Sequence, residues 1–278
     1  MHSTLSSVPY GRTSIVEEVF DQLASDYDQT FTNSLIGRAQ RNAVWKALDR
    51  TFRINDNILE LNCGTGEDAI HLATRGISVF ACDASQEMIA KAEYRISHIS
   101  ESLPLVFCHL STEQVSELRP ESQFDGVFSN FSGLNCIEDL NSVASSLSKL
   151  VKPGGHLLLC LSTRFCLIEI AYYLCRGHIK KAMRRCSGRS IATFKDLQLP
   201  VYYPTLRQLR RSFASDFKLQ SYTGIGVAVP PSYCERWALK HPSLLRFLCR
   251  LETVAATFPL LRVTGDHVLL CFEKVAPR

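Results

Sequence analysis

The stretch Ile58-Leu59-Glu60-Leu61-Asn62-Cys63-Gly64-Thr65-Gly66-Glu67-Asp68 carries the strongest fold signal in this sequence. An apolar run leads into a turn that contains glycines, and the following segment, residues 69–76, has the pattern of a helix closed by a glycine. The predicted order is strand, tight loop and helix. Because glycine has no Cβ, such a loop lets a nucleotide-like ligand lie directly against the backbone.

The next strand ends in a carboxylate that can hold a ribose. Residues 77–82 form a second apolar run, and Asp83 follows it. A carboxylate at the tip of the second strand can accept hydrogen bonds from both ribose hydroxyls of an adenosine. The segment 64–69 also satisfies the G-x-G-x-x-A form of the dinucleotide fingerprint, with Asp83 at about the expected distance. An NAD-dependent oxidoreductase is therefore one interpretation.

The same stretch resembles motif I of the class I S-adenosylmethionine-dependent methyltransferases, in which an acidic residue precedes a G-x-G-x-G-like loop. Glu60 is the acid here, and Asn62, Gly64 and Gly66 occupy the glycine positions. Asn62 departs from the motif, but asparagine is among the non-glycine residues that best tolerate a positive φ. The loop alone does not decide between the two cofactors.

A second motif favours methyl transfer over NAD chemistry. The string Leu150-Val151-Lys152-Pro153-Gly154-Gly155 resembles the "L-K-P-G-G" turn of the same superfamily. Proline ends a helix predicted over residues 137–151, and the two glycines reverse the chain into a strand over residues 156–161.

The resemblance implies an α/β fold with a Rossmann-like, seven-stranded mixed sheet, an antiparallel last strand and helical cap insertions. Segments 217–222 and 266–273 have the pattern of the two closing strands. We expect one methyltransferase domain over residues 1–278. Its expected parts are a core of residues 14–163, 205–229 and 265–276, and cap insertions at residues 164–204 and 230–264.

The resemblance also implies that S-adenosyl-L-methionine is the cofactor and S-adenosyl-L-homocysteine the product. A helix predicted from Ser14 carries Tyr27-Asp28, which is similar to an aromatic-Asp pair that closes over the cofactor in the superfamily. No metal site is predicted. The cofactor-binding candidates are Tyr27, Arg41, Glu60, Asn62, Gly64, Gly66, Asp83, Ala84, Met88, Leu110 and Ser129.

These candidates have expected roles. We expect Arg38 or Arg41, on a helix predicted over residues 35–52, to meet the cofactor's carboxylate. Glu60 is expected to orient the loop and the cofactor's amino-acid end, and Asp83 to hold its ribose. Ala84 and Met88 fall where the superfamily packs the adenine. The superfamily often has an aspartate for the adenine amino group where this chain has His109, so that contact passes to the backbone of Leu110, to Ser111 or to His109.

The acceptor is predicted to be an O or N atom of a small molecule. Ser129 ends a strand predicted from Phe124, beside the crevice in which open α/β sheets bind ligands. A hydroxyl acceptor needs a base, and a neutral histidine is the usual choice near pH 7. His267, next to Asp266 at the start of the last strand, is the candidate, whereas an amine or carbanion acceptor needs no base. A non-catalytic scaffold that only binds the cofactor is a third interpretation.

Composition points to an intracellular globular protein. The 278 residues are 46% hydrophobic and 21% charged, which excludes a disordered chain. Eleven cysteines, with no C-x-x-C pair, predict buried thiols in a reducing cytosol rather than a disulfide scaffold. No run has the length of a membrane span, and residues 1–10 have no signal-peptide pattern. A cytoplasmic location is expected.

Positive charge is concentrated in one segment. Residues 164–211 contain 11 Lys or Arg and two acids, a local charge of +9, whereas the whole chain carries +4. Such asymmetry predicts contact with an anionic or lipid-like acceptor or a peripheral membrane contact. A solvated basic helix with a buried apolar face explains the pattern too. Nucleic acid is disfavoured because aromatic residues are not interleaved with the cations. The oligomeric state is not predicted.

Overall fold

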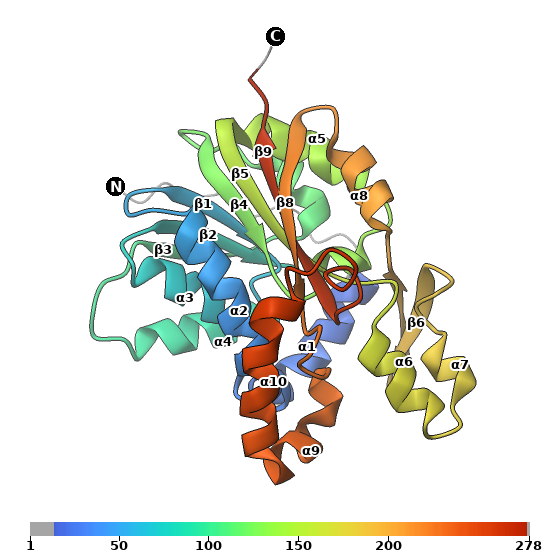
Figure 1. Cartoon of the computed structure of the whole chain (residues 1–278). Helices are drawn as coiled ribbons and strands as arrows, with labels where there is room; N and C mark the ends of the chain where they lie inside the picture. The colour runs from blue at the N-terminus through green and yellow to red at the C-terminus, as the bar shows by residue number, and fades with distance from the viewer. Residues whose placement is uncertain (1–13, 277–278) are drawn as a thin grey trace.

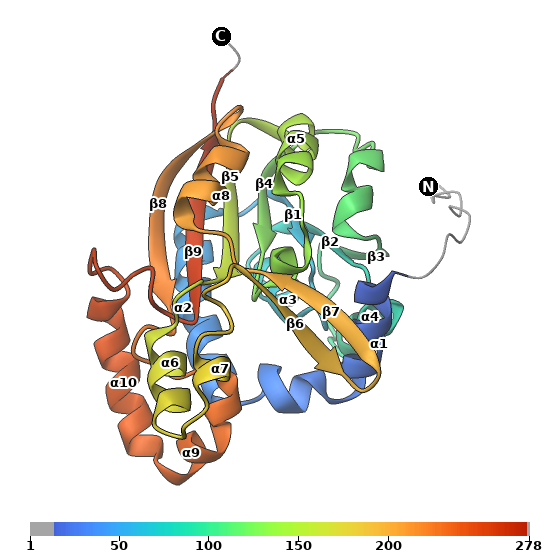
Figure 2. The same ribbon diagram turned by 90° about the vertical axis from the view of Figure 1, so that its right-hand side faces the viewer.

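The computed structural model describes residues 14–276, so the prediction that residues 1–12 are polar and frayed lies outside the described range. A central sheet has the strand order β3-β2-β1-β4-β5-β9-β8, with helices on both of its faces (Figures 1 and 2). Its strands are β1 (Asn57–Leu61), β2 (Ser78–Asp83), β3 (Leu105–His109), β4 (Phe124–Ser129), β5 (Val151–Ser162), β8 (Phe217–Ile225) and β9 (His267–Lys274).

The pairing of the strands confirms the predicted mixed sheet. Neighbouring strands from β3 to β5 run parallel, whereas β9 is antiparallel to both β5 and β8. The last strand is thus inserted antiparallel between the fifth strand and the edge strand. The parallel strands therefore all point their carboxyl ends to one edge of the sheet, where loops can gather ligand-binding groups.

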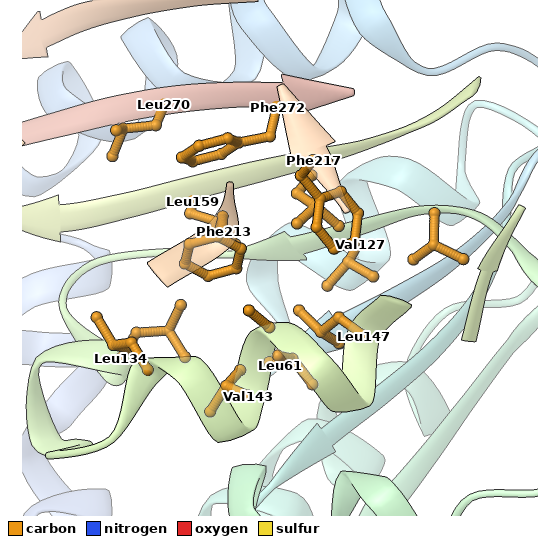
Figure 3. Packing of buried hydrophobic residues seen from close by; sticks show 14 of the residues in the cluster. Leu61, Val127, Leu134, Val143, Leu147, Leu159, Phe213, Phe217, Leu270 and Phe272 are labelled. Atoms are coloured by element: carbon orange, nitrogen blue, oxygen red, sulfur yellow. The ribbon is translucent and has the colours of Figure 1, made fainter. Parts of the chain in front are cut away.

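Each face of the sheet has its own hydrophobic core. On one face Leu147 and Phe213 pack against Phe272 of the sheet (Figure 3). On the other, Val44 and Leu72 pack against strand residues of β1, β2 and β4. The helices of these layers are α2 (Leu35–Thr51), α3 (Glu67–Ala73), α4 (Gln86–Ser97), α5 (Leu140–Leu150) and α8 (Leu206–Phe213).

Side-chain caps fix where several helices begin. Helix α1 (Ile15–Tyr27) starts after Ser14, whose hydroxyl accepts from the Glu17 N–H at 3.1 Å. Ser85 caps α4 in the same way and accepts from the Met88 N–H at 3.1 Å. Such a cap satisfies an N–H that has no partner in the first helical turn.

The K-P-G-G segment lies where the sequence predicted, but it is a bulge within β5 rather than a turn that precedes the strand. Helix α5 ends at Leu150, and β5 begins at once with Val151, which pairs with Phe124. The next pair on these strands is Gly126 with His156, so the four intervening residues bulge out of the ladder. Gly154 accommodates the bulge at φ +78°. The helix also starts later than predicted, because residues 133–136 form a 3₁₀ turn (η3) and Asp139 caps α5.

Two segments stand outside this core. The first contains α6 (Leu167–Leu174), α7 (Ile179–Ala182) and an antiparallel hairpin of β6 (Arg189–Phe194) and β7 (Leu197–Tyr202). The hairpin is absent from the prediction of purely helical insertions. The second contains η4 (Ser232–Cys234), α9 (Glu235–Lys240) and α10 (Pro242–Ala255). Between residues 14 and 276, no helix is long and apolar enough to cross a membrane.

We predict that Phe213→Ala lowers the free energy of unfolding by about 3–5 kcal/mol, because the substitution leaves a cavity between α8 and the sheet. Phe213 is fully buried, and its ring lies 5.0 Å from the ring of Phe272. Urea denaturation followed by circular dichroism measures the loss. Phe247→Ala, on the outer side of α10, is the matched control and should change stability by less than about 0.5 kcal/mol. Equal losses in both variants would contradict the packing argument.

Candidate functional site

A cavity lies at the carboxyl ends of β1, β2 and β4, beneath α1. The wall combines apolar side chains with a few polar groups. The lining residues are Val16, Phe20, Tyr27, Asn62, Gly64, Asp83, Ala84, Met88, Asn130, Phe131 and Gly133. A second lobe shares Tyr27, Asn62 and Gly64 and extends to Arg41, Thr65 and Asp68.

The loop after β1 has the backbone that the sequence predicted. Asn62 has φ +56°, and Gly64 has φ +54°. The Asn62 side chain donates to the Thr112 hydroxyl at 3.0 Å and accepts from the Ser129 hydroxyl at 3.1 Å. It also packs on Gly133, where a Cβ would lie 2.3 Å from the Asn62 Cβ. Asn62 therefore joins the loop to β4 and to η2 (Thr112–Glu117), which a glycine could not do.

The two glycines of the loop serve different purposes. A Cβ on Gly64 would meet only the Tyr27 ring, at 3.8 Å, so Gly64 leaves its side of the cavity open. A Cβ on Gly66 would lie 2.7 Å from the Phe107 ring and 2.9 Å from Ala92. Gly66, at φ +77°, thus allows α3 to begin against β3 and α4. A Cβ at Gly66 would therefore meet protein atoms, and the prediction that Gly66 permits close approach of the cofactor stays a prediction.

Asp83 ties the loop to the second strand. Its Oδ2 accepts from the Gly64 N–H at 2.8 Å, and its Oδ1 accepts from the Ser85 N–H at 2.9 Å. The carboxyl group is buried, and burial raises its pKa, while the two N–H donors oppose that rise. Each oxygen retains a further lone pair on the cavity side of the loop, which is the arrangement that two vicinal hydroxyls can use.

Tyr27 and Asp28 hold α1 over the glycine loop. Tyr27 ends the helix and lines both lobes of the cavity, and burial raises its pKa to about 12. Asp28 accepts from the Thr65 hydroxyl at 2.6 Å and pairs with Arg95 at 2.6 Å. It also begins a π-helix, η1 (Asp28–Thr32), a rare element that is frequent at functional sites.

Arg41 lies at the second lobe with Asp68 as its partner. Its Nη1 is 2.5 Å from Asp68 Oδ2, and both side chains are almost wholly buried. Asp68 also accepts from the Trp45 indole N–H at 2.6 Å and from the Asn130 amide at 2.9 Å. Arg41 Nε is buried, and no residue in the part of the chain that the structure describes accepts its hydrogen. A guanidinium at this position offers further donors to an anionic group in the lobe.

Glu60 is buried at the end of β1 behind the cavity wall. Its Oε2 has no hydrogen-bond partner among residues 14–276. Burial raises the pKa of this carboxyl well above its usual value, Asp68 and Asp83 add to the rise, and Arg41 opposes it. An unpaired buried carboxylate is costly, and a cationic ligand group nearby would reduce that cost.

The candidates on the β2 and β3 side divide into two groups. Ala84 and Met88 line the cavity, where they were expected to pack a ring. Leu110 instead donates its N–H to the Asp83 carbonyl at 2.9 Å, so only its carbonyl is available to a ligand. His109 lies 2.9 Å from the Ala84 carbonyl. Ser129 is fully buried and bound to Asn62, behind the wall rather than on it.

Some residues that line the cavity were not predicted from the sequence. Val16 and Phe20 of α1 line the cavity together with Tyr27. Their spacing of four and seven residues places them on one face of the helix, which was the available signal. Gly133 was also missed, because its role depends on its contact with Asn62.

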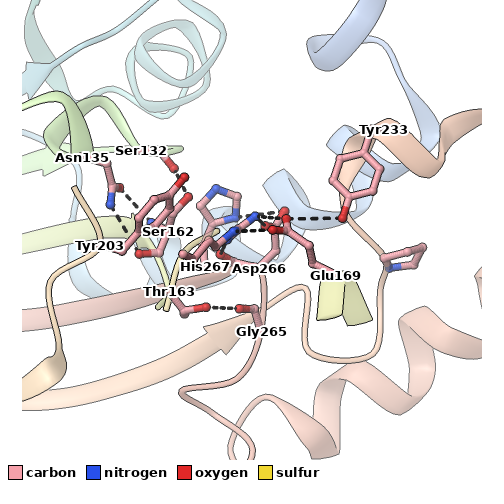
Figure 4. A network of polar contacts seen from close by, with 12 residues as sticks. Ser132, Asn135, Ser162, Thr163, Glu169, Tyr203, Tyr233, Gly265, Asp266 and His267 are labelled. Atoms are coloured by element: carbon pink, nitrogen blue, oxygen red, sulfur yellow. Dashed lines mark hydrogen bonds and ion pairs between the residues drawn. The ribbon is translucent and has the colours of Figure 1, made fainter. Parts of the chain in front are cut away.

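His267 stands behind Phe131, whose ring lines the cavity and lies 5.5 Å from the imidazole. His267 Nδ1 is buried without a partner, 3.6 Å from Asp266 Oδ2 (Figure 4). Burial lowers the pKa of His267, and the Asp266 charge opposes this effect. Phe131 and Ser132 have φ values of +43° and +70°. Strained backbone of this kind is common at functional sites.

A family described as "Methyltransferase domain" matches residues 58–155 of this chain. YqeM of Bacillus subtilis strain 168, which bears a methyltransferase name, is 29% identical over 155 residues. The match covers 55% of this chain and 59% of YqeM. The tRNA 5-carboxymethoxyuridine methyltransferase of Escherichia coli K12 is 27% identical over half of this chain and 54% of its own length. The chain thus spans less than two thirds of these two relatives.

A longer match joins this chain to the demethylmenaquinone methyltransferase of Oceanobacillus iheyensis, which is 28% identical over 79% of this chain and 94% of the relative. Among solved structures, a Haemonchus contortus N-methyltransferase in complex with phosphomonomethylethanolamine and S-adenosylhomocysteine has a TM-score of 0.60, at 18% identity over 97% of this chain and 61% of its own. A complex of DhpI with S-adenosylhomocysteine has a TM-score of 0.56, at 17% identity over 97% of this chain and all of its own. At these identities the likeness shows the fold.

We predict that Glu60→Gln raises the stability of the ligand-free protein and that the gain grows with pH. The folded-state pKa of Glu60 lies above the unfolded value of 4.5. Between those two values the folded state holds more protons, so wild-type stability falls as pH rises, whereas glutamine does not titrate. Each unit of pKa difference corresponds to about 1.4 kcal/mol.

Urea denaturation at several pH values between about 5 and 8 measures this difference. Glu93→Gln, an exposed substitution on α4, is the control and should give the wild-type profile. A stability difference for Glu60→Gln that stays constant across the pH range would show that the carboxyl group is not responsible.

Proposed function

We propose that this chain, a member of the class I S-adenosylmethionine-dependent methyltransferase superfamily, transfers a methyl group from S-adenosylmethionine to an O or N atom of a small, anionic or amphiphilic acceptor. The observation that carries the proposal is the cavity at the β1 loop, where Gly64 leaves the backbone bare and Asp83 presents a carboxylate beside it.

The residues present fit this cofactor. Asp83 would accept the ribose hydroxyls, and Ala84 and Met88 would pack the adenine. Arg41 would bind the carboxylate of the amino-acid end from the second lobe. Glu60, whose Oε2 has no hydrogen-bond partner among the described residues, would stabilise the positively charged amino group of the cofactor's amino-acid end electrostatically from behind the cavity wall. NAD shares the ribose but lacks an amino-acid end, so this charge pattern favours S-adenosylmethionine.

When bound, S-adenosylmethionine supplies a methyl group already activated by a sulfonium. The chain must then bring the acceptor atom in line with that group at about 3–3.5 Å and exclude water. Phe20 and Phe131 line the cavity and would exclude water from it. The β6–β7 hairpin reaches α1, with β7 in contact with that helix, and would limit the acceptor side (Figure 2).

A hydroxyl acceptor must lose a proton, and His267 is the proposed base. Its lowered pKa keeps the imidazole neutral near pH 7, which a base requires. Asp266 would stabilise the imidazolium once the proton arrives, because its own pKa is held low by Arg185 and His267 despite burial. Phe131 stands between His267 and the cavity, so a bound acceptor would have to displace its ring.

The acceptor class rests on two supports. Apolar side chains form much of the cavity wall, which suits a molecule with an apolar part. One relative is named for a small molecule, demethylmenaquinone, and it aligns with 79% of this chain. The relative named for tRNA aligns with half. A small-molecule acceptor is therefore preferred to RNA.

We predict that Asp83→Asn weakens S-adenosylmethionine binding about 10- to 150-fold, because an amide loses one acceptor and each hydrogen bond to a charged group contributes about 1.5–3 kcal/mol. Isothermal titration calorimetry measures the dissociation constant. Asp49→Asn is the matched control, since Asp49 pairs with His71 and Arg75 on the surface. Equal affinities of Asp83→Asn and wild type would exclude Asp83 as the ribose ligand.

We predict that S-adenosylmethionine and S-adenosylhomocysteine raise the thermal midpoint and that NAD(H) does not. A ligand at 100 times its dissociation constant stabilises the native state by about 2.7 kcal/mol. Transfer of labelled methyl groups into a small-molecule extract, and not into bulk tRNA, then tests the acceptor class. Stabilisation by NAD(H) alone would reject the proposal, and cofactor binding without transfer to either pool would favour a non-catalytic scaffold.

A further inference from the structure

The first insertion has its charged and apolar sides reversed. The buried residue of α6 is Glu169, whereas Leu167 and Leu174 of the same helix are 49% and 48% exposed. The Glu169 carboxylate pairs with Arg184 at 2.8 Å and with Arg185 at 2.6 Å. In an ordinary surface helix the apolar side faces the protein. Here the inward side is taken by an ion pair, and apolar side chains face outward.

The acids of the second insertion also face inward, beside its buried apolar residues Ala238 and Leu245. Glu235 of α9 accepts from the N–H groups of Leu35 and Ile36, at 2.7 and 3.1 Å. Glu252 of α10 accepts from the three successive N–H groups of residues 227–229, at 2.6–3.0 Å. Both acids of residues 230–264 are therefore used internally, and the five Lys and Arg of this segment are not offset by acids on its outer side.

The two insertions are attached to each other. The Tyr233 hydroxyl donates to Glu169 at 3.3 Å. The Tyr233 ring lies 5.4 Å from the Tyr172 ring and 5.8 Å from the Tyr173 ring. Figures 1 and 2 both place the α6–α7 corner and the α9–α10 corner at the same end of the molecule, away from the amino ends of the parallel strands. They form one surface unit.

We define the insertion end as residues 174–183 and 239–247. Neither segment contains Asp or Glu. Its exposed apolar side chains are Leu174, Ile179, Met183, Leu239, Leu244 and Phe247, each 46–65% exposed. Its cations are Arg176, Lys180, Lys181, Lys240 and Arg246. Exposed apolar side chains gathered at one end of a domain indicate an interaction site, and the cations among them indicate an anionic partner.

We propose that the insertion end docks on the surface of an anionic lipid bilayer. Apolar side chains would enter the boundary between headgroups and acyl chains, and lysines and arginines would contact the anionic headgroups. A second copy of the chain does not fit, because the same face would bring cations against cations. A bilayer also accepts two separate projecting corners without a matching groove, which a folded acidic protein would have to supply.

Docking in this way has a consequence for the cavity. The corners extend from the same edge of the sheet as the carboxyl ends of β1 and β4, where the cavity lies (Figure 1). An amphiphilic acceptor in the bilayer would then be close to the site. The docking itself involves neither cofactor nor acceptor, so it stands or falls independently of the proposed methyl transfer.

Co-sedimentation of the full chain with vesicles tests the proposal. The wild type should bind vesicles of phosphatidylcholine mixed with phosphatidylglycerol, more weakly in high salt, and bind pure phosphatidylcholine poorly. Lys180→Gln/Lys181→Gln should reduce partitioning about 30-fold, at about 1 kcal/mol for each cation. Lys149→Gln/Lys218→Gln, which removes two exposed lysines from other parts of the surface, is the matched control and should bind as wild type does.

A second variant tests the apolar contribution. Ile179→Ser/Leu239→Ser removes the two most exposed apolar side chains of the insertion end and should weaken partitioning about tenfold with unchanged circular dichroism. No binding to anionic vesicles would overturn the proposal. So would equal losses in the two lysine pairs, or an apolar variant that binds as wild type does, because either result indicates a general polyanion site. A dimer in light scattering that the apolar variant abolishes would assign the surface to a second copy.

Discussion

The hydrogen bonds of Asp83 are the constraint on which the site depends. One carboxylate binds the Gly64 N–H of the loop after β1 and the Ser85 N–H at the start of α4. These bonds offset the cost of burying the charge, and they fix the distance between two neighbouring strand ends. The cavity lies between those ends because the loop is held there and no side chain covers the Gly64 backbone. Without these two hydrogen bonds, the backbone at Gly64 would have no fixed position relative to the Asp83 carboxylate.

The Asp83 hydrogen bonds lie beneath helix α1, and polar contacts hold this helix in place. Asp21 of α1 accepts from the Ser85 hydroxyl at 2.6 Å, and Asp28 accepts from Thr65 and Arg95. The same two segments that Asp83 joins are thus also the anchors of α1. Few apolar residues of α1 are buried, namely Val19 and Ala24, so these polar contacts carry much of its attachment. Such contacts exchange readily with water, whereas the sheet beneath is held by two hydrophobic cores.

The insertions show the opposite distribution of polar and apolar groups. Their acids turn inward to hold guanidinium groups and backbone N–H groups, and several apolar residues at the insertion end are exposed. A buried ion pair contributes little net stability compared with apolar packing. The arrangement of Glu169 with Arg184 and Arg185 therefore gives these helices a fixed orientation rather than a large core, and it leaves apolar surface available at one end of the molecule.

The sequence by itself determined the parts that local pattern encodes. The order of strands and helices in the sheet core, the positive φ of Asn62, the Ser85 cap and the carboxylate after β2 all follow from residues within a few positions of one another. The K-P-G-G string was recognised, but whether it turns or bulges depended on how β5 pairs with β4. The outward direction of α6 was not predictable, because its apolar pattern is that of a buried helix.

Only the tertiary structure decided which side chains meet. Arg41 is hydrogen-bonded to Asp68, Asn62 to Thr112 and Glu235 to the start of α2, across sequence separations of 27 to 200 residues. It also showed that Gly66 serves packing on Phe107 and that Ser129 and Leu110 are occupied by protein partners. The periodicity of apolar residues shows which face of a helix or strand is buried, but it does not show which element packs against that face. These polar contacts depend on that packing partner. The sequence therefore determined the frame of the site, and the packing of distant elements determined its walls.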